Sequence, residues 1–435
     1  MIGQRSRGVV PLPTEQRVEE GYWNAAVPTY CVVPLQQHTG SRLHSLVAPD
    51  EVVREGMAIA ESGSRLAVPL HAPIPGRVAA LGEIELLDGS RSPALAIELD
   101  GEFDRLGKTP ELHPWEDLEP REILDLIRAA GVVCSPRATV PAHILLQPNP
   151  LSPRPAVVLD VAETEPYLSA DAELSVVRSR EVVTGLRIAG RILDAAELHV
   201  VVGDKYPRAL RALRAALAGL EGVSIRFHRV PHRYPANTEQ QLRRAVGLRP
   251  GRDDERDLVA LSPSTAEAVQ NAVAYRNPQI DRIIAVGGGA VRRPAHIRVR
   301  IGTSIADVLE ECGGLTEEPA RIVAGGSLTG LQVRNVNAPI TKGISAIVAL
   351  SHAEVNAGQE EPCVNCGGCV RACPVSLNPI LLHDLILDGR VEEARENRLM
   401  DCTECGLCAH VCPSRIPLVT RLRDGKRGDA ESGTE

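Results

Sequence analysis

The spacing of apolar and polar residues changes from region to region along this 435-residue chain. Over residues 1–115 the apolar runs are short and end at Pro, Gly or Asp, which is typical of β-strands joined by turns. Such runs cover Tyr30–Leu35, Glu51–Val53 and Ala94–Leu99. The pattern predicts an all-β region.

The spacing becomes helical at Glu119–Ala130, where Ile123, Leu124 and Ile127 would share one face. A connector with six prolines follows, from Pro136 to Pro155. Strand-like and helix-like segments then alternate up to residue 290, which predicts βαβ units and a mainly parallel sheet. The expected strands are Ala156–Val161, Leu198–Val202 and Val223–Val230, and the expected helices are Glu173–Asp194, Pro207–Ala218 and Thr238–Val246.

The last third of the chain divides into two further regions. Residues 291–352 read as a small mixed unit, with Ile297–Ile301 extended, Ser304–Cys312 helical and Ile344–Leu350 as a closing strand. Residues 353–423 read as helical, and the polar tail 424–435 as disordered. The expected fold class is therefore a multidomain α+β protein.

Composition and charge narrow the function classes. Apolar residues make up 43% and charged residues 24%, as in an ordinary globular protein. A net charge of −8 argues against a nucleic-acid-binding surface. No apolar stretch is long enough to cross a bilayer, and Met1–Arg7 leads into no apolar core, so neither a transmembrane segment nor a signal peptide is expected. Without an export signal, the eleven cysteines are not expected to form a disulfide framework, because the cytosol keeps thiols reduced.

Eight of the cysteines form two copies of one motif, C-x2-C-x2-C-x3-C-P, which is the spacing of bacterial two-cluster ferredoxins. The first three thiolates of each run bind one cluster, and the fourth, followed by proline, binds the other cluster. The two copies are Cys363, Cys366, Cys369, Cys373 with Pro374 and Cys402, Cys405, Cys408, Cys412 with Pro413. The motif therefore predicts two 4Fe–4S clusters with exchanged fourth ligands.

The expected ligand sets are Cys363, Cys366, Cys369 and Cys412 for one cluster, and Cys402, Cys405, Cys408 and Cys373 for the other. Zinc is the alternative, but zinc ribbons use pairs of C-x2-C rather than fourfold runs ending in Cys-Pro. The remaining cysteines, Cys31, Cys134 and Cys312, lie in apolar segments and are interpreted as core residues.

Several segments, in order along nearly the whole chain, resemble the C subunit of the Rnf electron-transport complex. They are Val33–Gly40, His71–Val78, Glu163–Tyr167, Arg298–Thr303 and Ala324–Gly326, together with the cysteine motifs. The resemblance implies four domains: a barrel-sandwich hybrid domain (1–115), an α/β domain like the flavin subunit of complex I (116–290), a β-grasp domain of the SLBB type (291–352) and a helical dicluster domain (353–423). His38 and His71 are interpreted as structural turn residues.

The chain departs from that family at its flavin loop. Family members that use NADH carry a glycine-rich loop there, whose N–H groups approach the flavin phosphate. Here Gly131 is followed by no glycine until Gly185, and Gly287–Gly289 leads into no helix, which a dinucleotide loop requires. Glu163, Glu165 and Tyr167 then read as scaffold, no catalytic residue is assigned, and neither FMN nor NADH is expected to bind.

Three functions stay open. The leading hypothesis is an electron-relay subunit of an Rnf-like complex, peripheral to the cytoplasmic face of the inner membrane, with membrane subunits and a ferredoxin-type or dehydrogenase partner. The second is an NADH:acceptor oxidoreductase that binds FMN through a rearranged loop. The third is a docking adaptor whose clusters are structural or sense oxygen.

Overall fold

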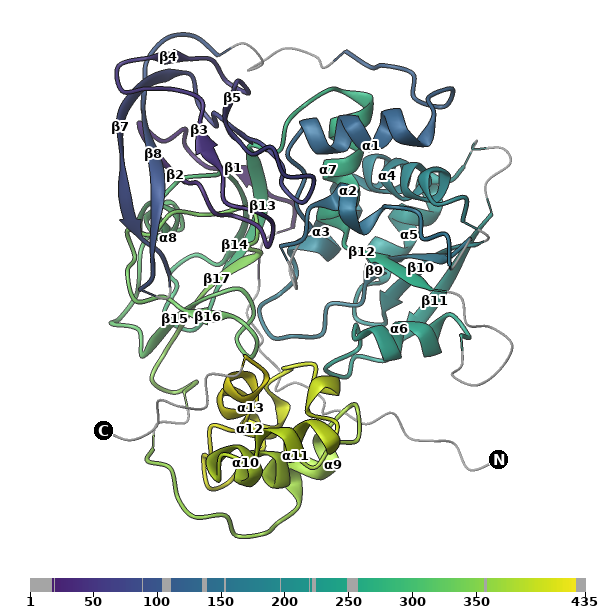
Figure 1. The fold of residues 1–435 in the computed structure, drawn as a ribbon, viewed down its shortest axis with the longest axis vertical. Helices are drawn as coiled ribbons and strands as arrows, with labels where there is room; N and C mark the ends of the chain where they lie inside the picture. Colours follow the sequence, from purple (N-terminus) through teal and green to yellow (C-terminus); the bar gives the residue numbers. More distant parts are fainter. Residues whose placement is uncertain are drawn as a thin grey trace.

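The computed structural model describes residues 18, 20–87, 89–103, 111–134, 139–151, 154–195, 197–218, 220, 224–248, 257–355 and 358–427. These residues form three bodies that contain β-sheet and one helical body (Figure 1). The expected class, multidomain α+β, is confirmed.

The N-terminal body consists of two small sheets around one apolar core. Every pairing within the two sheets is antiparallel. Both sheets contribute to the core, Val33 and Leu95 from one and Ile59 and Leu70 from the other. The first sheet has the order β2 (Tyr30–Pro34), β8 (Arg91–Leu99), β7 (Gly76–Glu85) and β4 (Val52–Val53); the second has the order β3 (His44–Ser45), β5 (Ala58–Glu61) and β6 (Leu70–His71).

The α/β body contains the predicted parallel sheet, with helices on both faces. Alternate residues of β9 point to opposite faces: Val157 and Leu159 pack with α4 and α7, whereas Val158 packs with Leu242 of α6. The strand order is β11 (Ile225–Val230), β10 (Glu197–Gly203), β9 (Ala156–Val161) and β12 (Leu258–Leu261). The helices are α1 (Pro120–Ala129), α2 (Ala142–Leu145), α3 (Ala170–Val177), α4 (Ser179–Ile192), α5 (Pro207–Ala216), α6 (Glu239–Ala245) and α7 (Pro263–Ala274).

The single helix expected at Glu173–Asp194 is wrong, because the structure has two helices there. The first begins earlier, at Ala170, where the half-buried carboxylate of Glu163 accepts the N–H of Ala172 in its first turn (2.9 Å). The chain leaves helical geometry at Arg178 (φ −126°, ψ 34°) and starts again as α4. A carboxylate 9 residues away decided where the first helix begins, which periodicity alone does not reveal.

The third body is a six-stranded mixed sheet that also contains one strand from each of the two preceding regions of the sequence, 1–115 and 116–290. The expected boundary at residue 290 is wrong, because β13 pairs with β14 and β17 rather than with the parallel sheet. The N-terminal strand β1 also joins this sheet, beside β14. The order is β1 (Trp23–Asn24), β14 (Ala295–Arg300), β13 (Asp281–Gly287), β17 (Ala346–Leu350), β15 (Arg321–Ala324) and β16 (Leu331–Gln332), with α8 (Ile305–Glu311) packed against it.

The C-terminal body is helical and lies at one end of the molecule (Figure 1, yellow). Its elements are α9 (Gly368–Ala372), α10 (Pro379–Leu387), α11 (Val391–Glu396), η1 (Leu399–Asp401), α12 (Leu407–His410) and α13 (Leu418–Arg427). Residues 424–427, expected to be disordered, are helical instead, since Gly425 packs against Ile386 and α13 continues to Arg427. Residues 428–435, the rest of the expected tail, lie outside the described residues, as do parts of the proline-rich connector.

Candidate metal centre

The two cysteine motifs fold as two copies of one local structure, 39 residues apart. Each copy has a left-handed residue after its first cysteine and a left-handed glycine after its second. These are Asn365 and Glu404 (both φ 53°), then Gly367 and Gly406 (φ 66° and 77°). The left-handed turns point backbone N–H groups back at the thiols, so Asn365 donates to Cys363 Sγ and Glu404 to Cys402 Sγ, each at 3.4 Å.

One cavity collects thiols from both motifs. A cubane binds each of its four thiolates through a different iron, so its ligands surround a space. Apolar side chains, among them Leu377, Val419 and Leu422, form the rest of the wall. The thiols that line this cavity are Cys373, Cys402, Cys405 and Cys408, which is one of the two ligand sets expected from the sequence. In the part of the chain that the structure describes, no three His, Cys, Asp or Glu side chains converge as ligands of a single metal ion.

The other four cysteines lie nearer the surface. Cys363 and Cys366 are exposed, and Cys369 and Cys412 pack together around Ile416. Cys408 belongs to the same apolar cluster as Cys369 and Cys412, so the two sets of thiols adjoin. The spacing of the motif predicts that Cys363 belongs to the same set as Cys369 and Cys412.

The set that lines the cavity, in which Cys373 and Cys408 are buried and Cys402 and Cys405 half-buried, faces the α/β body. Tyr234 is almost fully buried, and its hydroxyl donates to the carbonyl of Cys405 (2.7 Å). Leu328, in a loop of the six-stranded sheet, packs so closely on Gly406 that a Cβ there would lie 2.7 Å from the Leu328 carbonyl. Neither residue was singled out from the sequence, because nothing in a lone tyrosine or leucine marks it as a neighbour of a motif 171 or 78 positions away.

The residues that resemble part of a flavin site, Glu165 and Tyr167, form hydrogen bonds with other residues of the chain. Glu165 accepts hydrogen bonds from the N–H groups of Leu328 and Thr329 (2.7 and 2.8 Å) and from the Thr329 hydroxyl (2.8 Å). Tyr167 donates to Glu354. Burial, with repulsion from Asp171, raises the pKa of Glu163 to about 8.

The N–H groups of residues 132–134, in the loop after α1, also donate to acceptors within the protein. Val132 donates to the Ile127 carbonyl (3.3 Å), Val133 to the Gln279 side chain (2.9 Å) and Cys134 to the Val140 carbonyl (2.8 Å). The carbonyl of Gly131 accepts from the buried amine of Lys342 (2.6 Å). Residues 135–138 of the loop lie outside the described residues.

The remaining sequence candidates have structural surroundings. Cys31, Cys134 and Cys312 are buried, and burial raises the pKa of the first two thiols to about 12 and of the third to about 11. His38 accepts the N–H of Gly40 through Nδ1 (2.9 Å) and so shapes its own turn. His71 is at the end of β6, opposite Ala58 of β5.

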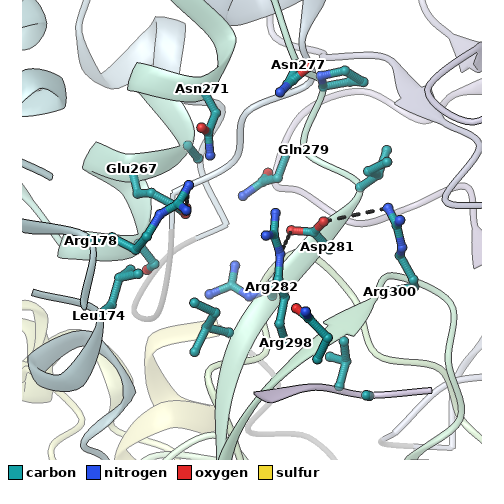
Figure 2. A pocket seen from close by; sticks show the side chains of 18 of the residues that line it. Leu174, Arg178, Glu267, Asn271, Asn277, Gln279, Asp281, Arg282, Arg298 and Arg300 are labelled. Atoms are coloured by element: carbon teal, nitrogen blue, oxygen red, sulfur yellow. Dashed lines mark hydrogen bonds and ion pairs between the residues drawn. The ribbon is translucent and has the colours of Figure 1, made fainter. Parts of the chain in front are cut away.

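A second cavity, of about 360 Å³, lies where three bodies meet (Figure 2). Its charged groups largely pair with one another. Asp281 binds Arg298 (3.0 Å) and Arg300 (3.6 Å), and Arg178 lies 3.7 Å from Glu267. Arg300 also binds Glu55 of the N-terminal body at 2.6 Å. The pairing identifies this cavity as a charged interface that joins the bodies.

Replacing Arg300 with methionine is expected to lower the free energy of unfolding by about 3 kcal/mol, because it leaves the carboxylate of Glu55, only 2% exposed, as an uncompensated buried charge. Urea unfolding followed by tryptophan fluorescence measures the change. The control is Arg91→Met, which removes an exposed pair with Glu83 (4.0 Å) and should cost less than about 1 kcal/mol. Equal effects of the two substitutions would show that burial of the pair is unimportant.

Family comparisons assign each body. Residues 7–102 match the RnfC barrel sandwich hybrid domain, 127–274 the Nuo51 FMN-binding domain, 283–332 the SLBB domain and 357–423 the 4Fe-4S dicluster domain. The SLBB match begins within β13, in agreement with the sheet pairing. The fold also resembles the NAD+-reducing [NiFe]-hydrogenase in its H2-reduced state, with a TM-score of 0.51, 16% identity, and coverage of 74% of this chain and 63% of that one.

Curated relatives match over most of the chain. The C subunit of the ion-translocating oxidoreductase complex of Rhodobacter capsulatus is 36% identical, with 92% of this chain and 78% of the relative covered. The C subunit of the proton-translocating ferredoxin:NAD(+) oxidoreductase complex of Clostridium ljungdahlii is 33% identical, with 86% and 82% covered. Its counterpart in the Na(+)-translocating complex of Acetobacterium woodii is 29% identical, with 92% and 91% covered.

The four bodies and the paired cysteine motifs define an iron–sulfur electron-transfer subunit whose α/β domain has the fold of a flavin-binding subunit. Its iron–sulfur groups are 4Fe–4S clusters. The chain belongs to the family of Rnf complex C subunits, so other subunits of such a complex are its partners. Among the described residues, no helix combines the length and apolarity that a membrane span requires.

Proposed function

We propose that the chain relays single electrons between a redox partner and the other subunits of an Rnf-type complex, with ligands Cys373, Cys402, Cys405 and Cys408 for one cluster and Cys363, Cys366, Cys369 and Cys412 for the other. The observation that carries the proposal is the cavity lined by the first four thiols, three from one motif and one from the other. A 4Fe–4S cluster accepts and releases one electron at a time.

The two ligand sets suit two ends of a relay. The surface set, with Cys363 and Cys366 exposed, is open to an incoming protein, which we propose to be a ferredoxin-type or dehydrogenase partner. The set that lines the cavity contacts Tyr234 and Leu328 and so lies toward the rest of the subunit. We propose that the chain binds the membrane subunits at the cytoplasmic face of the inner membrane, in keeping with its relatives' membership of ion-translocating complexes.

We also propose that the α/β domain has lost the flavin and NADH chemistry of its fold. In open α/β sheets ligands bind beyond the carboxyl ends of the strands. There the N–H groups of residues 132–134 are bonded internally. A phosphate would have to displace these hydrogen bonds, which disfavours binding.

The competing function is an NADH:acceptor oxidoreductase that binds FMN through a rearranged loop. The observation that favours it is the match of residues 127–274 to the Nuo51 FMN-binding domain. Fluorescence of the extract after acid release measures flavin in the anaerobically purified protein. A stoichiometric flavin would establish this function in place of the flavin-free relay.

The expected result for the relay is that dithionite bleaches the broad visible absorption of the anaerobic protein and NADH does not. The reason is that the clusters are reducible, while the N–H groups of residues 132–134, in the loop that would seat a flavin, are already bonded within the protein. If NADH alone bleaches the absorption, the chain is a dehydrogenase. If neither reagent bleaches the absorption and iron stays bound, the clusters are structural. That result would favour the docking adaptor.

A further inference from the structure

The two motif copies differ in charge at equivalent helical positions. Helices α10 and α13 follow their motifs at the same spacing of 39 residues, so their side chains can be compared one by one. Position 404 carries Glu where the first copy has Asn365. Position 423 carries Arg where the first copy has Asp384, and position 426 carries Lys where it has Leu387.

In the second copy these three side chains form a fixed group around Cys402. The amine of Lys426 donates to the Cys402 carbonyl (2.9 Å) and to Glu404 Oε1 (2.8 Å). Arg423 donates to the other oxygen of Glu404 (2.9 Å). The Lys426 side chain is only 19% exposed, so its charge is poorly screened by solvent.

Glu404 neutralises one of the two cations, which leaves one net positive charge against the turn of Cys402. The first copy has its own cation, Arg371, which donates to the Cys366 carbonyl (3.0 Å), but this contact is exposed to solvent. The residue equivalent to Arg371 in the second copy is His410. The buried, cation-bearing environment is therefore specific to the second copy.

Adding an electron to a cluster adds negative charge, which burial penalises and a nearby cation stabilises. We propose that Lys426, held in place by Glu404 and Arg423, raises the reduction potential of the cluster bound by Cys373 and the second motif. The lysine thereby offsets the cost of reducing a cluster in a buried site. This inference rests on the proposed relay function, since it concerns the potentials of the same two clusters.

The test is a redox titration of both clusters by electron paramagnetic resonance, on full-length protein prepared without oxygen and checked for iron content. Lys426→Met is expected to lower the equilibrium constant for reduction of one cluster about tenfold, which lowers its potential by about 59 mV for one electron. The potential of the other cluster should not change. Lys426→Arg keeps the charge and should restore the potential. A purely mechanical anchor for α13 would leave both potentials unchanged in Lys426→Met, and that result overturns the proposal.

A matched gain of charge tests the same idea without touching Lys426. Leu387, at the equivalent position, is 56% exposed, so a lysine there causes no packing defect. Leu387→Lys is expected to raise the potential of the other cluster, by less than tenfold because solvent screens it. If Lys426→Met loses iron, the test rests on Leu387→Lys. An unchanged potential in Leu387→Lys would then overturn the proposal. Failure of the wild type to accept electrons from dithionite would instead overturn the relay function.

Discussion

Replacing Cys373 with alanine is expected to remove the cluster of the second motif, although Cys373 belongs to the first. The cavity places its thiol with Cys402, Cys405 and Cys408, and the backbone N–H of Leu377 donates to it (3.3 Å). A cluster that lacks one of four thiolates is labile, so iron should fall by about half. Iron analysis and electron paramagnetic resonance of the reduced protein measure the loss.

The decisive comparison is among three variants. Cys373→Ala should give the same remaining spectrum as Cys402→Ala and a different one from Cys363→Ala. Cys312→Ala is the control, because this buried thiol lies in the core of the six-stranded sheet and should leave iron unchanged. If Cys373→Ala matches Cys363→Ala instead, each motif binds its own cluster and the ligand exchange is wrong.

Replacing Lys342 with methionine is expected to abolish a rise in stability that the wild type shows between about pH 7 and pH 10. Lys342 is 1% exposed, and burial lowers its pKa from 10.5 to about 7. Its amine donates to the carbonyls of Gly131 (2.6 Å) and Pro69 (3.4 Å), so it joins the loop after α1 to the N-terminal body. Burial without a compensating charge disfavours the protonated form in the folded protein.

The sign follows from proton binding. Between the folded pKa near 7 and the unfolded value near 10.5, the unfolded chain binds more protons, so stability rises with pH across this window. Below pH 7 both states are protonated and the penalty is present in full. At 1.36 kcal/mol per pKa unit the penalty is about 5 kcal/mol at most. Other groups that titrate in the window are common to both proteins and cancel in the difference.

Urea unfolding of wild type and variant at several pH values, followed by tryptophan fluorescence, measures that difference. Lys205→Met is the control, because Lys205 is exposed and its loss should leave the pH dependence unchanged. A constant difference between wild type and Lys342→Met from pH 7 to 10 would contradict a lowered pKa for this lysine.

The sequence by itself determined the order of the domains, the parallel sheet and the cysteine spacing. These are local signals: strand and helix periodicities, and a motif whose geometry is repeated within a few residues. It also revealed that Gly131 is followed by a loop without glycine, and the N–H groups of residues 132–134 are indeed bonded internally.

Only the tertiary structure decided where strands and charges meet. Strands β1 and β13 join the six-stranded sheet because pairing depends on partners far along the chain, which periodicity does not specify. Residues 424–427 were expected to be disordered because they are polar, yet Gly425 packs against Ile386 and the helix continues through them. The same error hid Lys426, whose role depends on the carbonyl of Cys402 lying 2.9 Å away. Burial and charge pairing act through space, so residues such as Lys342 and Lys426 acquire their properties only from the fold.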